Sequence, residues 1–213
     1  MNLENTHPEL EGKHAVFSAS KHSWINYDDA KLVAAYISSY SSTIGTLVHA
    51  YAKDKIIYRQ PLEDNKSERN ALMLHLLKND IPTRVIAIDT LFYNLMPYVN
   101  DAIGFKMTPE LRLYYSDYCF GTADAVSYYR NTLRIHDLKT GSGQVSMDQL
   151  MIYAGLFFLQ FKKDVNLQKS KVELRIYQNQ DIITCNPSIS DIETMIGIIQ
   201  HATAVVDKDI LEA

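Results

Sequence analysis

The sequence predicts an α/β fold in which a central mixed β-sheet is flanked by helices. Three observations lead to this. Two β-rich runs, 121–129 and 133–139, flank Arg130, Asn131 and Thr132, which have the residue types of a hairpin turn. Apolar residues recur with helical spacing before these runs, over 28–59. A further helix over 147–162 leads into an alternating strand over 169–178.

The N-terminal half is expected to be helical. Residues 1–26 are expected to form an N-terminal arm, followed by a helix from Asp28 to about Tyr40 and another from about Ser42 to Arg59. Gly45 and His49 share a stripe of small residues on the second of these helices. Because glycine is a poor helix former, we expect close backbone approach at position 45.

A helical insert beside the sheet is predicted for residues 61–104, with a break at Pro82. Asp89 and Asp101, in its second half, are expected to be solvated or capping charges. A strand over 111–118 then leads into the hairpin and makes a three-stranded antiparallel meander.

The strand that begins at Leu133 ends in an acid and an amine on its apolar face. Side chains alternate between the two faces of a strand. One face therefore carries Leu133, Ile135, Asp137 and Lys139, and the other carries Arg134, His136 and Leu138. Burying either charge alone would be costly. One interpretation of Asp137 and Lys139 is a strand-end salt bridge, which contributes little if exposed. The other is a metal site, with Lys139 beside a phosphate.

Asp124 favours the metal site. It follows Gly121 by three positions and is flanked by alanines, which is an unusual setting for a solvated charge. Across the hairpin its carboxylate can approach Asp137, and two such carboxylates repel unless a proton or a cation lies between them. Magnesium accepts one or two carboxylates together with water and phosphate oxygens, so the pair suits it.

The start of the helix after Gly143 has two alternative interpretations. Ser146 and Gln149 fit a capping box. Gln149 and Tyr153 are also four apart and therefore share a helix face beside a helix N-terminus, where a phosphate is stabilised. A second capping box, Ser190 with Glu193, is predicted to open the last helix.

Composition restricts the class of protein. Of the 213 residues, 46% are hydrophobic, which is enough for a sizeable core, and no apolar run is long enough to span a bilayer. No signal peptide is recognised, and the two cysteines, Cys119 and Cys185, are expected to be free thiols in a reducing compartment. The net charge of −4 argues against a bulk nucleic-acid coat protein.

Three motifs in order resemble the PD-(D/E)XK nuclease superfamily, and specifically its RecB-like exonuclease branch, which includes many phage recombination nucleases. They are Gly121 with Asp124, Asp137 with Lys139, and Gln149 with Tyr153. Gly45 and His49 match the Gly-x-x-x-His pattern that this branch carries in an earlier helix. The resemblance implies a restriction-endonuclease-like core, with residues 1–213 forming a single nuclease domain.

The resemblance implies a metal-dependent DNA nuclease, expected to be an exonuclease in DNA recombination, repair or phage DNA processing. One or two Mg²⁺ or Mn²⁺ ions would be held by His49, Asp124, Asp137 and the Leu138 main-chain carbonyl. Lys139 would orient or deprotonate the attacking water or stabilise the transition state, and Gln149 and Tyr153 would position the substrate. For His49 the alternative is a satisfied core histidine, which is the commoner role of a lone histidine on an apolar face.

Several partners and one alternative function accompany this expectation. The partners are DNA, a second copy of the chain in a homo-oligomer, and a phage recombination partner such as a single-strand annealing protein. The expected location is the cytoplasm of a bacterium or phage-infected host, with no membrane. The alternative is a catalytically inactive DNA-binding or assembly protein that keeps the nuclease fold. An iron–sulfur relative would need four cysteine ligands, and this chain has two.

Overall fold

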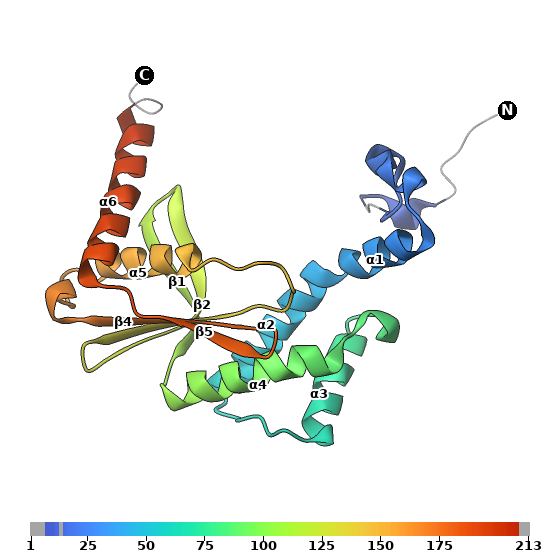
Figure 1. The fold of residues 1–213 in the computed structure, drawn as a ribbon, viewed down its shortest axis with the longest axis horizontal. Coiled ribbons are helices and arrows are strands. Elements are labelled where there is room, and N and C mark those ends of the chain that lie inside the picture. Colours follow the sequence, from blue (N-terminus) through green and yellow to red (C-terminus); the bar gives the residue numbers. More distant parts are fainter. Residues whose placement is uncertain (1–6, 13–14, 209–213) are drawn as a thin grey trace. The chain divides into compact units, whose positions relative to one another are not determined.

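The computed structural model describes residues 7–12 and 15–208 and contains a five-stranded mixed sheet flanked by helices (Figure 1). The predicted α/β fold class is confirmed. The chain divides into two compact units, residues 1–43 and 44–213. The assignment of residues 1–213 to a single nuclease domain stays a prediction.

The first unit is helical. It contains 3₁₀ helices at Pro8–Leu10 and Ala19–Asn26, followed by helix α1, Asp29–Ser39. Asp28 caps α1, because its side chain accepts a hydrogen bond of 2.8 Å from the Lys31 N–H. The predicted N-terminal arm, 1–26, lies partly outside the described residues, at 1–6 and 13–14.

Five further helices and two 3₁₀ turns follow. They are α2 (Ser41–Ile57), α3 (Lys66–Leu77), α4 (Ile88–Gly104), α5 (Asp148–Gln160) and α6 (Ile189–Val206), with the turns at Thr83–Val85 and Leu167–Lys169. The predicted insert over 61–104 contains α3 and α4. Helix α4 begins at Ile88, because the segment after Pro82 first makes the 3₁₀ turn.

The strands are β1 (Thr108–Ser116), β2 (Cys119–Tyr129), β3 (Thr132–Leu138), β4 (Lys171–Gln178) and β5 (Asp181–Cys185), in the spatial order β1-β2-β3-β4-β5. Strands β1, β2 and β3 form the predicted antiparallel meander, and β3 pairs with β4 in parallel after the α5 crossover. The β2–β3 turn has φ values of 48° at Arg130 and 57° at Asn131, as a tight hairpin requires.

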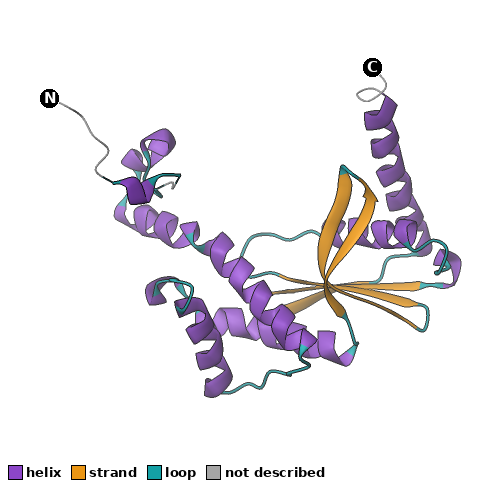
Figure 2. Cartoon of the chain, turned by 180° about the vertical axis from the view of Figure 1, so that it is seen from behind, coloured by secondary structure: helices purple, strands orange, loops and turns teal. Residues whose placement is uncertain are grey.

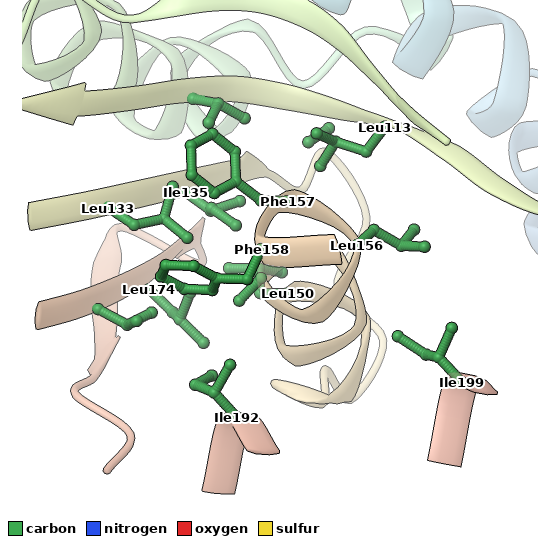
Figure 3. Packing of buried hydrophobic residues seen from close by; sticks show 14 of the residues in the cluster. Leu113, Leu133, Ile135, Leu150, Leu156, Phe157, Phe158, Leu174, Ile192 and Ile199 are labelled. Atoms are coloured by element: carbon green, nitrogen blue, oxygen red, sulfur yellow. The ribbon is translucent and has the colours of Figure 1, made fainter. Parts of the chain in front are cut away.

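The main core lies between the sheet and α5. Figure 3 shows Leu133, Ile135 and Leu174 from the strands facing Phe157 and Phe158 of α5, and all five are buried. Helix α6 covers another side of α5 with Ile192 and Ile199, so α5 is apolar on several faces. Burial of each such side chain stabilises the fold by about 1.5–3 kcal/mol.

A charged network lies on the other face of the sheet, beneath α4. Asp101 of α4 accepts hydrogen bonds from Arg175 Nη1 at 2.7 Å and from the Tyr177 hydroxyl at 2.6 Å. The expectation that Asp101 is a solvated or capping charge is therefore wrong, because strand β4 supplies two donors to it. Asp89 agrees better with the expectation of a solvated charge, because its side chain is 71% exposed, although it forms a salt bridge with Arg69.

The last helix begins two residues earlier than predicted. Ser188 and Asp191 form the capping box, with hydrogen bonds between side chain and backbone in both directions. Glu193, predicted for this role, instead accepts a hydrogen bond of 2.6 Å from Gln168.

Cys119 and Cys185 are free thiols, as predicted. Within residues 7–12 and 15–208, none of the helices combines the length and the apolar character needed to cross a membrane.

Candidate functional site

The candidate site lies where β2 and β3 separate. The ladder between these strands ends at the Ala125–His136 pair, and Asp124 and Asp137 are the next residue on each strand. Beyond this point β2 pairs with β1, while β3 continues along β4 to the Leu138–Tyr177 pair. Figure 2 shows the outer part of the β1–β2 hairpin turning away from the other strands. The two predicted carboxylates therefore flank the opening of the sheet.

The backbone is irregular at Asp124. Ala123 and Val126 both belong to the core beneath α5 although they are three residues apart, so the alternation of side chains is interrupted between them. Opposite Asp124, Glu110 has a φ of 54°, which is unusual for a residue other than glycine. Such irregularities redirect side chains and occur next to functional sites.

Asp124 is held between a backbone N–H and a histidine. Its Oδ2 accepts a hydrogen bond of 2.9 Å from the Leu138 N–H and lies 3.5 Å from His49 Nδ1. His49, Glu110 and Asp124 each offer one potential metal-ligand atom, and these three atoms all lie within 4.8 Å of one another. Carboxylate oxygens and an imidazole nitrogen at this separation could hold a divalent cation.

Helix α2 brings His49 to the sheet because position 45 has no side chain. A Cβ built on Gly45 would lie 3.1 Å from Thr140 Oγ1, in the segment that follows β3. The predicted close approach at Gly45 is therefore confirmed. The same face of α2 buries Val48 and Ala52, which fixes the orientation of the helix.

A chain of polar contacts connects Asp137 to α5. Asp137 is 3% exposed, and Lys139 Nζ lies 3.0 Å from both of its carboxylate oxygens. The ammonium donates a well-aligned hydrogen bond only to Oδ1, so Oδ2 is buried without a hydrogen-bond donor. Lys139 Nζ also donates to Gln149 Oε1 at 3.0 Å, and Gln149 Nε2 donates to the Tyr153 hydroxyl at 3.3 Å.

The capping role predicted for Gln149 is wrong. Helix α5 begins at Asp148, with Met147 at the N-cap position and no side-chain cap. Ser146 Oγ accepts a hydrogen bond of 3.1 Å from the Asp148 N–H instead. Because Gln149 lies one residue closer to the helix start than a capping box requires, its amide is free to bind the charged Lys139.

Gly121 makes room for Tyr153. A Cβ at position 121 would lie 2.8 Å from Tyr153 Cε1, which is closer than real side chains approach. The ring therefore rests against the β2 backbone three residues before Asp124. This contact accounts for the glycine in the Gly121–Asp124 motif.

Two buried amides hold the chain after β3, and the sequence analysis missed both. Asn94 of α4 donates to the Lys139 carbonyl at 3.2 Å and accepts from the Gln180 N–H at 2.8 Å. Gln178 donates to the Gly141 and Gly143 carbonyls at 2.6 and 2.9 Å. The only sequence signal was for Asn94, which is a polar amide within an apolar helical segment.

The site carries an excess of negative charge. The pKa of Asp124 is raised to about 6, chiefly by burial and also by the charges of Asp137 and Glu110, against the lowering effects of His49 and the Leu138 N–H. Burial also raises the pKa of Tyr98 well above its ordinary value, assisted by Asp124, Glu110 and Asp137. A cation would relieve this repulsion.

The geometry regroups the predicted metal ligands. His49 and Asp124 lie together as predicted, and Glu110, which the sequence analysis missed, joins them. Asp137 is near enough to raise the pKa of Asp124, but its carboxylate is engaged by Lys139. Leu138 contributes its N–H to Asp124, and the ligand role of its carbonyl stays a prediction.

Comparison with known proteins gives one match. A family model described as "Protein of unknown function (DUF2800)" matches residues 14–197. No curated protein and no solved structure matches the chain.

Proposed function

Because the chain belongs to the DUF2800 family, whose function is unknown, we propose its function from the site: it is a divalent-metal-dependent DNA nuclease of the RecB-like PD-(D/E)XK type. The observation that carries the proposal is the convergence of Asp124, Asp137 and Lys139 where β2 and β3 separate, with His49 beside them. The antiparallel meander followed by a helix and a parallel strand supports a restriction-endonuclease-like core.

The residues of the site fit Mg²⁺ or Mn²⁺. Asp124 and Glu110 offer hard oxygen donors beside the His49 imidazole, and Asp137 Oδ2 has no hydrogen-bond donor. A bound ion, or two, would lower the pKa of a coordinated water and offset the charge of the attacked phosphate. Asp137, held by Lys139, lies on the side of the opening that faces α5.

The chain's own groups then have distinct roles. His49 and Asp124 hold the ion, with Glu110 as an additional ligand and Asp137 as a ligand or a partner of Lys139. The Lys139 ammonium orients the attacking water or stabilises negative charge on the phosphate. Gln149 fixes Lys139 through its 3.0 Å hydrogen bond, and Tyr153 fixes Gln149 in turn. Together they prearrange the ammonium before substrate arrives.

We place this activity, expected to be exonucleolytic, in DNA recombination, repair or phage DNA processing in the cytoplasm of a bacterium or phage-infected host. DNA is the proposed partner. A homo-oligomer and a single-strand annealing protein are the further partners that this role would involve.

The alternative is a catalytically inactive DNA-binding or assembly protein with the same fold. The buried Asp137–Lys139 pair argues for activity, because an uncompensated loss of either charge is the simplest way to inactivate such a site and neither has been lost.

The proposal is tested by digesting end-labelled linear, nicked and circular DNA. The reactions contain Mg²⁺ or Mn²⁺, with and without EDTA. We expect metal-dependent release of nucleotides from linear DNA, and a loss of about a hundredfold or more in Lys139→Met, because a charge that stabilises the transition state is removed. Lys163→Met, an exposed lysine after α5, is the matched control. Metal-independent digestion, or equal rates in parent and Lys139→Met, would show the assignment to be wrong.

A further inference from the structure

The β1–β2 hairpin continues beyond the site as an arm, residues 111–123, that pairs with no other strand of the sheet. One face of this arm packs on α5 through Leu111, Leu113 and Ala123. The Tyr114 N–H donates a hydrogen bond of 2.8 Å to Gln160 Oε1 at the end of α5. The arm is therefore fixed to the body of the second unit.

The opposite face of the arm carries two exposed aromatic rings. Tyr114 and Phe120 are paired across the hairpin and are 47% and 58% exposed. Their rings are stacked, with centroids 6.5 Å apart and an interplanar angle of 25°. The Tyr114 hydroxyl donates to Asp117 at 2.9 Å, which fixes the orientation of its ring. Exposed rings held in this way form a surface on which other flat groups can stack.

A cation lies between these rings and the carboxylates of the site. Arg112 pairs with Thr122, one step along the hairpin from Glu110 and Asp124, and Tyr114 pairs with Phe120 at the next step. Alternate residue pairs of a hairpin, whose side chains share one face, are about 6.8 Å apart along the strands. Arg112 is exposed. The order along this face is thus carboxylates, guanidinium and stacked rings.

We propose that this face of the arm binds the single-stranded end of the DNA substrate. Arg112 contacts a phosphate next to the one at the site, and Tyr114 and Phe120 stack on unpaired bases beyond it. Aromatic stacking requires bases that are free of a duplex, which is why the face fits a single strand. The spacing of the steps is comparable to that of neighbouring phosphates in an extended strand. The inference rests on the proposed nuclease function, because that function places a scissile phosphate at Asp124.

Binding is measured by fluorescence anisotropy with a labelled oligothymidylate of about ten nucleotides, in the Lys139→Met background so that no cleavage occurs. Phe120→Ala is expected to weaken binding about tenfold, because one base loses its stacking partner. Arg112→Gln is expected to weaken it severalfold and to reduce its salt dependence, because one phosphate contact is lost. Phe120→Leu keeps an apolar side chain without an aromatic ring and should weaken binding nearly as much as Phe120→Ala.

Tyr129→Ala is the matched control, since Tyr129 is an equally exposed aromatic residue at the other end of β2. It should bind the oligonucleotide as the parent does. If Phe120→Ala and Arg112→Gln bind no more weakly than Tyr129→Ala, the inference is overturned. It is also overturned if a blunt duplex of the same length binds as tightly through the same residues, or if the parent binds no oligonucleotide.

Hydrolysis of bis(p-nitrophenyl) phosphate by the parent separates the two proposals, because this small diester reaches the site without needing the arm. If the parent cuts it with metal but the arm variants bind and cut the oligonucleotide as the parent does, the nuclease stands and the arm inference fails. If the parent cuts neither substrate but oligonucleotide binding depends on Phe120 and Arg112, the nuclease proposal fails and the strand-binding face stands.

Discussion

Two groups of charged side chains, one beneath α4 and one at the site, differ in how their charges are balanced. Beneath α4, Arg175 lies 2.7 Å from Asp101 and 3.0 Å from Glu173, and Arg134 also approaches Glu173. Two guanidinium groups therefore face two carboxylates. At the site, Asp124, Asp137 and Glu110 are accompanied by the Lys139 ammonium and the His49 imidazole.

Burial shifts the pKa of one buried group in each place, and neighbouring charges add to both shifts. In the network beneath α4, burial lowers the pKa of His136 to about 3, assisted by Arg175 and Arg134. His136 is thus neutral there and shares a 3.0 Å hydrogen bond with Tyr177. At the site, the pKa of Asp124 is raised to about 6. The charges of the first group are balanced within the protein, whereas the second becomes favourable when a cation is added.

The largest expected effect on stability is therefore in the balanced network. Asp101→Ala should lower the free energy of unfolding by about 2–3 kcal/mol, because Arg175 and the Tyr177 hydroxyl lose their shared acceptor. Urea denaturation measures it. Asp89→Ala removes an exposed carboxylate from the same helix and is the control. An Asp101→Ala cost no greater than that of Asp89→Ala would contradict the structural role of the network.

Acidification provides a second test of the network. The folded pKa of His136, about 3, is below its unfolded value of about 6.5, so its contribution is full above pH 6.5 and is lost as the pH falls. The stability difference between parent and His136→Gln should shrink by about 1–2 kcal/mol between pH 7 and pH 5. Denaturation curves at several pH values measure it, and a constant difference would show that His136 is not neutral in the fold.

The fold could be predicted from the sequence where an element depends only on residues close to it in the chain. The turn at Arg130 and Asn131 and the alternation from Leu133 to Lys139 depend on neighbouring residues, and both were found. The contact between Gln149 and Tyr153 follows from helix periodicity in the same way. The predicted hairpin brings Asp124 and Asp137 to the same end of the β2–β3 ladder.

The parts that were missed depend on tertiary contacts. Glu110 reaches the site because it lies opposite Asp124 with a φ of 54°, and neither the register nor the dihedral angle is encoded locally. Asp101 was predicted to be solvated because its donors come from β4, 74 residues later in the chain. The Gln149 and Glu193 capping predictions failed because α5 begins at Asp148 and α6 at Ile189, which leaves those side chains to bind Lys139 and Gln168.

At the site, removing charge should have the opposite effect on stability. The folded pKa of Asp124, about 6, is above its unfolded value of about 3.9, so the ionised carboxylate costs stability as the pH rises from about 4 to about 6. In EDTA at pH 7.5, Asp124→Asn should be more stable than the parent by about 1–2 kcal/mol, and the gain should disappear near pH 4. Denaturation at both pH values tests this. A destabilised Asp124→Asn protein at pH 7.5 would contradict the proposed excess of negative charge.

The smallest expected effect concerns space at the site. Gly121→Ala should displace the Tyr153 ring and cost about 1 kcal/mol, because a Cβ would lie 2.8 Å from it. Gly143→Ala, where a Cβ meets nothing within 4 Å, is the control. Thermal unfolding compares the two, and cleavage by Gly121→Ala should fall because Gln149 loses its partner. Equal stability and equal cleavage in both variants would contradict the close packing of Tyr153.

The most direct test of the account is Mn²⁺ binding to the parent, Asp124→Asn and Asp101→Asn, measured by electron paramagnetic resonance. We predict that the parent binds Mn²⁺, that Asp124→Asn binds it at least about tenfold more weakly, and that Asp101→Asn binds it as the parent does. The same affinity in Asp124→Asn and the parent, or no binding by the parent, would contradict a metal site at the separation of β2 and β3.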